Sequence, residues 1–163
     1  MDSVYFYGHS NGRSTQTPWL SNFYKVPNGF EYADFTFTTS EHALMYAKAT
    51  LMGDEESAMK IKQAATPLAA KRLGRKVKPW DQTRWNAECE GTMREILIAK
   101  FSNPEMKPKL LSLMGRGIYE ASPRDKIWGI GISVKQAESG VPHKGRNLLG
   151  KALMAARDTL SEM

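Results

Sequence analysis

Apolar and polar residues alternate in short stretches near both ends of the chain, which is the spacing of β-strands. Residues 4–7 are aromatic and β-branched and predict an initial strand. Across residues 30–37 the aromatic positions change face near Asp34, so this segment predicts a hairpin or a bulged strand. Residues 118–120 and 127–132 predict two further strands, one on either side of a polar turn.

Most of the remaining chain shows the spacing of amphipathic helices. The longest such pattern covers residues 79–101, and its apolar stripe consists of Trp85, Cys89, Met93, Ile96 and Lys100. We expect this segment to be the core helix, with Gly91 as its weakest point. Shorter helices are expected at residues 54–64, 66–74, 104–114 and 147–160.

The order of these elements predicts the fold class. Strands lie toward both ends, helices are massed between them, and strand and helix do not alternate strictly. We therefore expect a compact α+β fold, mostly helical with a small sheet. A length of 163 residues, with 41% hydrophobic and 25% charged residues, is typical of one globular domain, so residues 1–163 are expected to form a single domain.

The formal net charge of +6 favours anionic partners such as phosphates, nucleotides or nucleic acid. Because the basic residues are spread along the chain, the charge is equally compatible with a role in solubility alone. Cys89 is the only cysteine and the N-terminal residues lack a signal-peptide pattern, which favours the cytoplasm. The longest apolar run, residues 96–99, is far shorter than the roughly 18 residues of a membrane span, so no membrane association is expected.

A carboxylate and an amine share one face of a helix expected to begin near residue 38. Glu41 and Lys48 are seven residues apart, two helical turns, so their side chains point the same way. Beside a cleft, such a pair suits general acid–base or nucleophilic catalysis. Two structural alternatives are open: Thr38 and Glu41 fit a capping box, and Glu41 and Lys48 could form an ordinary surface ion pair.

Residues 145–152 have the glycine and lysine spacing of a phosphate-binding loop, but Ala152 replaces the magnesium-binding hydroxyl. We interpret them as the start of the last helix, whose free backbone N–H groups could, with Arg146 and Lys151, meet an anion. The basic cluster around the end of the 66–74 helix complements the helix dipole, which favours a solvated face over the alternative of a phosphate site. Its members are Arg72, Arg75, Lys76 and Lys78.

Other single residues carry weaker predictions. His9, His42 and His143 lack metal-ligand spacing, so we expect no metal and no other cofactor. Cys89 lies on the apolar stripe and is interpreted as inert core. Trp128 follows a polar turn and precedes two glycines, a position from which it could stack on a base.

Four blocks occur in order along the chain. They are Trp19-Leu20-Ser21-Asn22-Phe23, Ser40-Glu41-His42 with Lys48, residues 122–131 (SPRDKIWGIG) and residues 145–154 (GRNLLGKALM). Together with Ala65-Thr66-Pro67 and Leu73-Gly74-Arg75, they resemble the NADAR (YbiA-like) family over residues 4–157. The chain departs from the family pattern at residues 43–47, where an aromatic and glutamine-rich stretch is common, and at Trp19, where a phenylalanine is common.

The resemblance implies hydrolysis of an N-glycosidic bond, either in phosphoribosylamino-pyrimidine intermediates of riboflavin synthesis or in ADP-ribose attached to guanine bases. It also implies a compact α+β fold, no metal, and a pocket near the start of the helix that holds Glu41 and Lys48. Glu41, Lys48 and Asp125 are the candidate catalytic residues. The candidate substrate-binding residues are Arg13, Ser21, Asn22, Trp128, Gly129, Asn147 and Lys151.

Cleaving a ribose–base bond builds positive charge at the anomeric carbon while the departing nitrogen needs a proton. Glu41 and Asp125 can supply the carboxylate and the proton donor. Either a carboxylate activates water, or Lys48 attacks the sugar and forms a Schiff base, with Arg13 or Lys151 as the neighbouring cation that lowers its pKa. The resemblance favours the lysine route for ADP-ribosylated substrates.

The expected partner is a substrate that contains ribose phosphate or ADP-ribose, including ADP-ribosylated DNA or RNA. A non-catalytic binder of ADP-ribose or nucleic acid is the alternative from another functional class. The oligomeric state is left open by the sequence.

Overall fold

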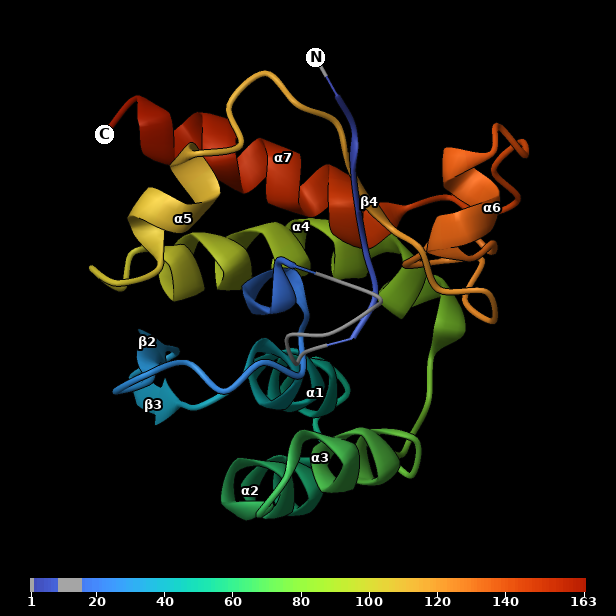
Figure 1. Ribbon diagram of the computed structural model, residues 1–163. Coiled ribbons are helices and arrows are strands. Elements are labelled where there is room, and N and C mark those ends of the chain that lie inside the picture. Colours follow the sequence, from blue (N-terminus) through green and yellow to red (C-terminus); the bar gives the residue numbers. More distant parts are fainter. Residues whose placement is uncertain (1, 9–15) are drawn as a thin grey trace.

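The computed structural model describes residues 2–8 and 16–163, which form a mostly helical molecule with two small pairs of strands (Figure 1). The helices are α1 (Ser40–Leu51), α2 (Glu55–Gln63), α3 (Pro67–Gly74), α4 (Gln82–Phe101), α5 (Lys107–Leu111), α6 (Val134–Glu138) and α7 (Leu148–Ser161). The strands are β1 (Val4–Phe6), β2 (Phe30–Tyr32), β3 (Phe35–Phe37) and β4 (Ile118–Glu120), and a 3-10 turn, η1, covers Pro18–Leu20. The predicted α+β fold class is confirmed.

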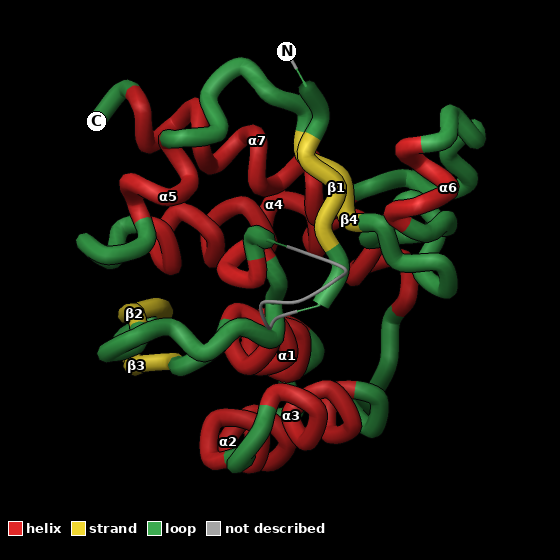
Figure 2. Tube along the Cα trace, viewed as in Figure 1, coloured by secondary structure: helices red, strands yellow, loops and turns green. Residues whose placement is uncertain are grey.

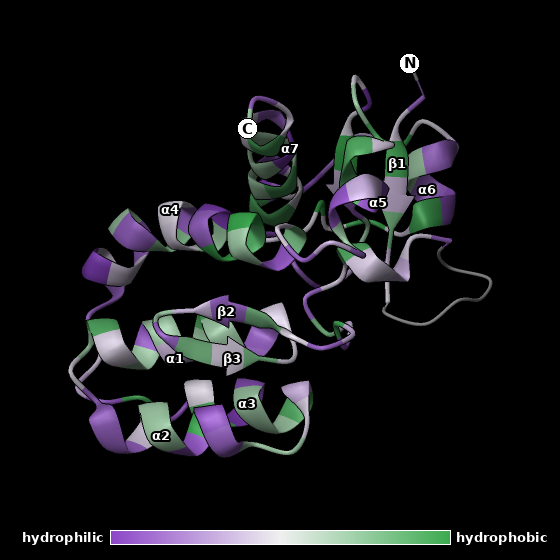
Figure 3. Cartoon of the chain, turned by 90° about the vertical axis from the view of Figure 1, so that its left-hand side faces the viewer, coloured by the Kyte–Doolittle hydropathy of each residue, from purple (hydrophilic) through white to green (hydrophobic). Residues whose placement is uncertain are grey.

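The helices are stacked in layers. In Figure 1, α7 lies over α4, α4 lies over α1, and α2 and α3 lie beneath α1, and the turned view of Figure 3 shows the same order. The central helix α1 packs against α2, α3 and α4, while α7 packs against α4, α5 and β4. Ile96 and Leu97 of α4 and Leu153 of α7 are fully buried and belong to one continuous hydrophobic core. Burying each of them contributes about 1.5–3 kcal/mol.

Short polar side chains fix where several helices begin. Asp54, Thr66 and Asp81 accept hydrogen bonds from backbone N–H groups in the first turns of α2, α3 and α4. Pro67 occupies the first position of α3, where a missing N–H costs nothing. The helix predicted at residues 79–101 therefore begins later, at Gln82, because the Asp81 cap defines its start.

The two strand pairs differ in how far apart their partners lie in the sequence. β2 and β3 form an antiparallel hairpin, as predicted, and its turn residues Ala33 and Asp34 have φ values of 53° and 68°. β1 instead pairs in parallel with β4, with Phe6 opposite Glu120, and Figure 2 shows the two strands side by side. This long-range pairing was not predicted.

The prediction of a strand at residues 127–132 is wrong. These residues form turns and bends. Their backbone carbonyls accept hydrogen bonds from the segment before α7. The N–H of Lys144 donates to the carbonyl of Ile130 (2.8 Å), and the N–H of Asn147 donates to the carbonyl of Gly129 (3.0 Å). Gly131 has a φ of 73°, a left-handed conformation that interrupts any strand. The apolar alternation therefore marks a buried loop.

The remaining helix predictions are confirmed with changed ends. The predicted apolar stripe of α4 is buried along its length. The helix predicted at residues 104–114 is confined to Lys107–Leu111, and α6, which begins with a capping box between Ser133 and Gln136, was not predicted. Among the described residues, no helix is long and apolar enough to cross a membrane.

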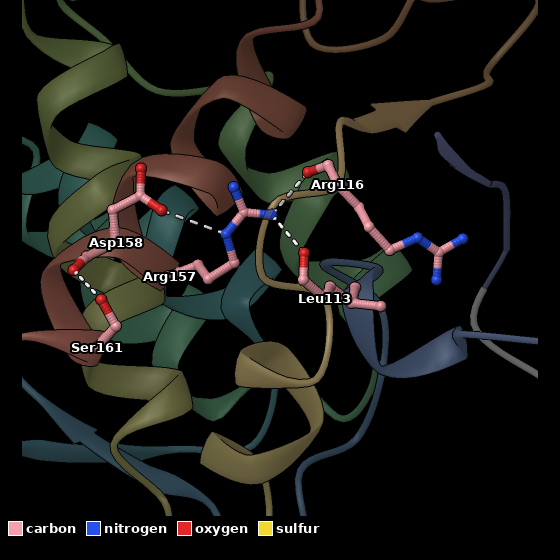
Figure 4. Close-up of polar contacts among 5 residues, drawn as sticks. All are labelled: Leu113, Arg116, Arg157, Asp158 and Ser161. Atoms are coloured by element: carbon pink, nitrogen blue, oxygen red, sulfur yellow. Dashed lines mark hydrogen bonds and ion pairs between the residues drawn. The ribbon is translucent and has the colours of Figure 1, made fainter. Parts of the chain in front are cut away.

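A buried arginine ties α7 to the segment that follows α5 (Figure 4). Nη1 of Arg157 donates to the backbone carbonyls of Leu113 and Arg116, both at 2.7 Å. Its Nε contacts the exposed carboxylate of Asp158 at 3.3 Å. The guanidinium thus bonds two backbone carbonyls of the loop that joins α5 to β4.

Candidate active site

A cleft of about 240 Å³ brings together residues from five separate segments. Its walls are the loop before β2, the helices α1 and α3, the end of β4, and the turn that follows β4. The residues that line it are Ser21, Asn22, Phe23, Glu41, Leu44, Met45, Lys48, Lys71, Arg75, Glu120, Asp125 and Trp128. We call it the Glu41 cleft. It contains all three candidate catalytic residues.

Glu41 is a buried carboxylate rather than a helix cap. The cap of α1 is Thr39, whose hydroxyl accepts from the N–H of His42, so the predicted capping box of Thr38 and Glu41 is wrong. The Glu41 side chain is only 7% exposed. Burial raises its pKa to about 7, although the positive charges of nearby lysines oppose this shift. Glu41 can therefore exchange a proton near neutral pH.

Lys48 lies on the same side of α1 and is half-buried. Its Nζ is 4.6 Å from the ring centroid of Trp80 and 5.9 Å from that of Trp85. Burial lowers the pKa of Lys48, and the negative charge of Glu41 partly opposes this effect. The described cation that lowers this pKa further is Arg75 and not the predicted Lys151. Between residues that the structure describes, no ion pair joins Glu41 to Lys48. The alternative of an ordinary surface ion pair is therefore wrong.

Two further acidic side chains face the cleft. Oδ1 of Asp125 accepts hydrogen bonds from the backbone N–H groups of Ile127 and Trp128, both at 2.9 Å, which fixes the carboxylate within its own turn. Glu120, at the end of β4, was missed by the sequence analysis. Burial raises its pKa to about 8, with further contributions from the negative charges of Asp125 and Glu41.

Lys71 and Arg75 carry positive charge into the cleft from α3. They are one helical turn apart, so they share a face. Nζ of Lys71 lies 5.9 Å from the ring centroid of Phe23, which also lines the cleft. Lys71 was not predicted, and Arg75 was predicted only as a member of the basic cluster at the end of this helix and of a segment that resembles the family. Their four-residue spacing was the signal that could have found the pair.

A hydrogen-bond network behind the cleft holds Ser21 and Asn22. The Ser40 hydroxyl donates to Oδ1 of Asn22 (2.8 Å), and the carbonyl of Asn22 accepts the N–H of Glu41 (2.9 Å). Lys100, which is fully buried, donates from Nζ to the carbonyl of Ser21 (3.0 Å). Burial lowers the pKa of Lys100 to about 7. The network links α4 to the loop that carries Asn22.

Three candidate substrate-binding residues are not among those lining the cleft. Asn147 is buried, and its amide accepts the N–H of Glu120 and donates to the carbonyl of Ile118, both at 3.0 Å. Asn147 thereby positions β4 instead of facing the cleft. Gly129 is packed against the turn, and Lys151 is exposed on α7. Arg13 lies outside the described residues.

The arrangement suits chemistry that needs a proton donor, a carboxylate and a nucleophilic amine around one small ligand. Trp128 and Phe23 offer ring surfaces, and Lys71 and Arg75 offer charge for a phosphate. Within residues 2–8 and 16–163, no cluster of histidine, cysteine or acidic side chains has the geometry of a metal site. The absence of a metal in the working protein stays a prediction.

Comparisons with known proteins agree with this picture. A family model described as the NADAR domain matches residues 5–161. "N-glycosidase R617" of Acanthamoeba polyphaga mimivirus is 36% identical over 162 residues, which cover 95% of this chain and 94% of that protein. "N-glycosidase YbiA" of Escherichia coli is 30% identical over 156 residues, which cover 87% of this chain and 89% of that protein.

The solved structure of Escherichia coli YbiA has a TM-score of 0.75 and 28% identity, covering 99% of this chain and 88% of that one. "Riboflavin biosynthesis protein VVA0006" of Vibrio vulnificus is 30% identical over 98% of this chain, but the match covers only 39% of that protein. N-glycosidases are hydrolases, and the enzyme class predicted from the sequence is confirmed by these relatives. The chain belongs to the NADAR family.

Proposed function

We propose that the protein hydrolyses the N-glycosidic bond between ribose and a base, with ADP-ribosylated guanine as the substrate. The observation that carries this proposal is the convergence of Glu41 and Lys48, a carboxyl group with a raised pKa and an amine with a lowered pKa, on one cleft. Each pKa is moved toward neutrality, where general acid–base catalysis is most effective. The relatives named N-glycosidases support this reaction class.

In the lysine route, the neutral amine of Lys48 attacks the anomeric carbon while Glu41, in its protonated form, gives its proton to the departing base nitrogen. The sugar ring then opens to a Schiff base between its first carbon and Lys48. Water, deprotonated by the Glu41 carboxylate, adds to this carbon and releases the sugar and the amine. In the alternative route, water attacks directly and a carboxylate takes its proton.

The remaining cleft residues have roles that follow from their positions. We assign the substrate's ribosyl phosphate to Lys71 and Arg75, the pair of cations on α3. We assign the base to the ring of Trp128, which lines the cleft and whose backbone N–H is held by Asp125. Asn22, anchored by Ser40, is placed to bond a sugar hydroxyl. The cytoplasmic location expected from the sequence stays a prediction.

A second candidate substrate is a phosphoribosylamino-pyrimidine intermediate of riboflavin synthesis. The Vibrio vulnificus relative named a riboflavin biosynthesis protein favours it, although only part of that protein is matched. Both substrates contain the same ribose–nitrogen bond, so the same cleft would act on either. Incubating the protein with each compound and identifying the products by mass spectrometry separates the two.

The test of the proposed function is base release by three variants. Glu41→Gln removes the titratable group but keeps its shape, and it should lower the rate of guanine release by about 10²–10⁴-fold with the circular dichroism spectrum unchanged. Lys48→Arg keeps the charge but cannot form a Schiff base. The matched control is Glu56→Gln on the exposed face of α2, which should keep full activity.

Borohydride reduction identifies the route. If Lys48 attacks the sugar, borohydride traps a covalent adduct of the wild type that is absent in Lys48→Arg. If the wild type releases the base but borohydride traps no adduct, water attacks the anomeric carbon directly. A wild-type protein that binds ADP-ribosylated guanine and returns it unchanged would refute the enzymatic function and favour a binding module.

A further inference from the structure

One amine lies in the hydrophobic core and has no part in the mechanism proposed above. Lys100 is fully buried on α4, on the same stripe as Met93 and Ile96. Among the residues that the structure describes, no carboxylate forms an ion pair with it. A buried amine is costly unless its N–H groups are bonded, so the groups that Lys100 bonds indicate its role.

Both partners of Lys100 lie where the wall of the Glu41 cleft meets α1. Nζ is 3.0 Å from the carbonyl oxygen of Ser21, which lines the cleft, and 3.5 Å from the hydroxyl oxygen of Ser40, the first residue of α1. These contacts join residues 79 and 60 positions apart in the sequence, so Lys100 fastens two distant segments to α4. An amine has at least two N–H groups in either protonation state, so both contacts are satisfied whether or not Lys100 is charged.

The bonds around Ser40 have a fixed direction. The Ser40 hydroxyl has one proton and donates it to Oδ1 of Asn22 (2.8 Å), so its oxygen accepts from Nζ of Lys100. The Asn22 amide is thereby oriented with its oxygen toward Ser40 and its Nδ2 away from it. Among the described residues, Nδ2 has one partner, the weakly accepting sulfur of Met93 at 3.7 Å. The second N–H of this nitrogen is left for a ligand in the cleft that Asn22 lines.

The loop that Lys100 holds is also bonded to the residue with the catalytic carboxyl group. The backbone carbonyl of Asn22 accepts the N–H of Glu41 (2.9 Å). A shift of the Ser21 carbonyl would therefore move the Asn22 amide relative to Glu41. A displacement of about 1 Å at a positioning group is enough to weaken a productive substrate contact severely.

From these contacts we infer that Lys100 is a positioning residue, which fixes the Asn22 amide with one N–H directed to a hydroxyl oxygen of the substrate's ribose. Lys100 acts through the Ser40 hydroxyl and the Ser21 carbonyl and touches no substrate itself. The inference rests on the proposed function and adds to it the buried residue on which the sugar contact depends.

The test is a double-mutant cycle between Lys100 and Asn22, with ADP-ribosylated guanosine as the substrate. Lys100→Met removes the N–H groups and keeps a side chain of similar length, and Asn22→Ala removes the amide. We expect each variant alone to raise KM about tenfold, the effect of one lost hydrogen bond, with kcat near the wild-type value. Because both residues serve one contact, the double variant should also raise KM about tenfold instead of about a hundredfold.

Two further variants separate positioning from general stability. Ser40→Ala breaks the link between Lys100 and Asn22 but leaves both side chains in place, and it should raise KM like Lys100→Met. Arg157→Met is the matched control, because it removes a buried cation whose bonds go to backbone carbonyls outside the cleft. It should lower the free energy of unfolding and leave KM unchanged.

The form of the kinetic effect distinguishes the two roles. A variant that is partly unfolded has fewer active molecules, so its apparent kcat falls while its KM stays the same. A fall in kcat alone for Lys100→Met would thus show a purely structural role and overturn the inference. A wild-type KM in Lys100→Met, or additive effects in the cycle, would also overturn it.

Two arrangements keep the test decisive. If Lys100→Met does not fold, Lys100→Gln, which retains N–H groups of shorter reach, takes its place in the cycle, and a non-additive rise in KM is again expected. If the wild type releases no base, the proposed function fails separately, and the same cycle measured on Kd for ADP-ribose by calorimetry decides the inference. A wild type that binds no ADP-ribose would overturn both.

Discussion

The buried amine of Lys100 predicts an unusual pH dependence of stability. Lys100 is fully buried, and its pKa falls from 10.5 to about 7 in the folded protein because burial disfavours the charged form. Between these two values the unfolded chain holds a proton that the folded protein lacks. The free energy of unfolding therefore rises with pH across this window, and this contribution falls away as pH drops from 10.5 and is fully lost by about pH 7.

The size of the effect follows from the shift. At about 1.4 kcal/mol for each pKa unit, a fall from 10.5 to about 7 amounts to about 5 kcal/mol. Lys100→Met replaces the amine with an apolar side chain of similar length that does not titrate. The difference in unfolding free energy between wild type and variant should then change by up to about 1.4 kcal/mol per pH unit in favour of the wild type as pH rises from 7.5 to 9.5.

Urea denaturation followed by tryptophan fluorescence measures this difference at several pH values. Glu41 and Glu120 have raised pKa values and contribute the opposite trend below about pH 8, but they are present in both proteins and cancel in the difference. Lys109→Met, at an exposed position on α5, is the control and should give a curve parallel to the wild type. Parallel curves for Lys100→Met would refute the assignment of a neutral buried amine.

Three further predictions concern the cleft and its supports. Asp125→Asn removes a negative charge that raises the pKa of Glu41, so the limb of the pH–rate profile that reports Glu41 should move to lower pH, and a limb that stays in place would contradict this electrostatic coupling. Asn147→Ala removes both side-chain bonds to β4 and should lower the unfolding free energy in urea by about 3 kcal/mol, whereas a loss below 1 kcal/mol would show that these bonds are dispensable. Gly74→Ala places a methyl group against the sulfur of Met45 and should cost about 1–3 kcal/mol by thermal denaturation, with an unchanged melting temperature as the contrary result.

Local signals in the sequence were sufficient to predict most helices. Asp54 and Thr66 cap α2 and α3 at the predicted starts, because capping depends on residues only three positions apart. The hairpin of β2 and β3 was predictable for the same reason, since its strands are joined by a short turn. The stripe that includes Lys100 was correctly placed in the core, but nothing local indicated which groups its amine would bond.

Features that depend on distant contacts could not be predicted. β1 (residues 4–6) and β4 (residues 118–120) are far apart in the sequence, so no local pattern placed Glu120 in the cleft. Residues 127–132 alternate like a strand because Ile130 and Ile132 are buried in a loop, and burial gives the same alternation without strand pairing. Lys48 and Glu41 were found because helical spacing alone sets them on one face.

The pairing of β1 with β4 also has a consequence for biosynthesis. One wall of the cleft depends on β4, which is held on one side by β1, a strand synthesised long before it, and on the other by Asn147, at the start of α7. A nascent chain in which Asn147 and α7 have not yet been synthesised cannot hold that wall in position. Translation products that stop before Asn147 should therefore be inert, and turnover reports that β4 has met both β1 and the start of α7.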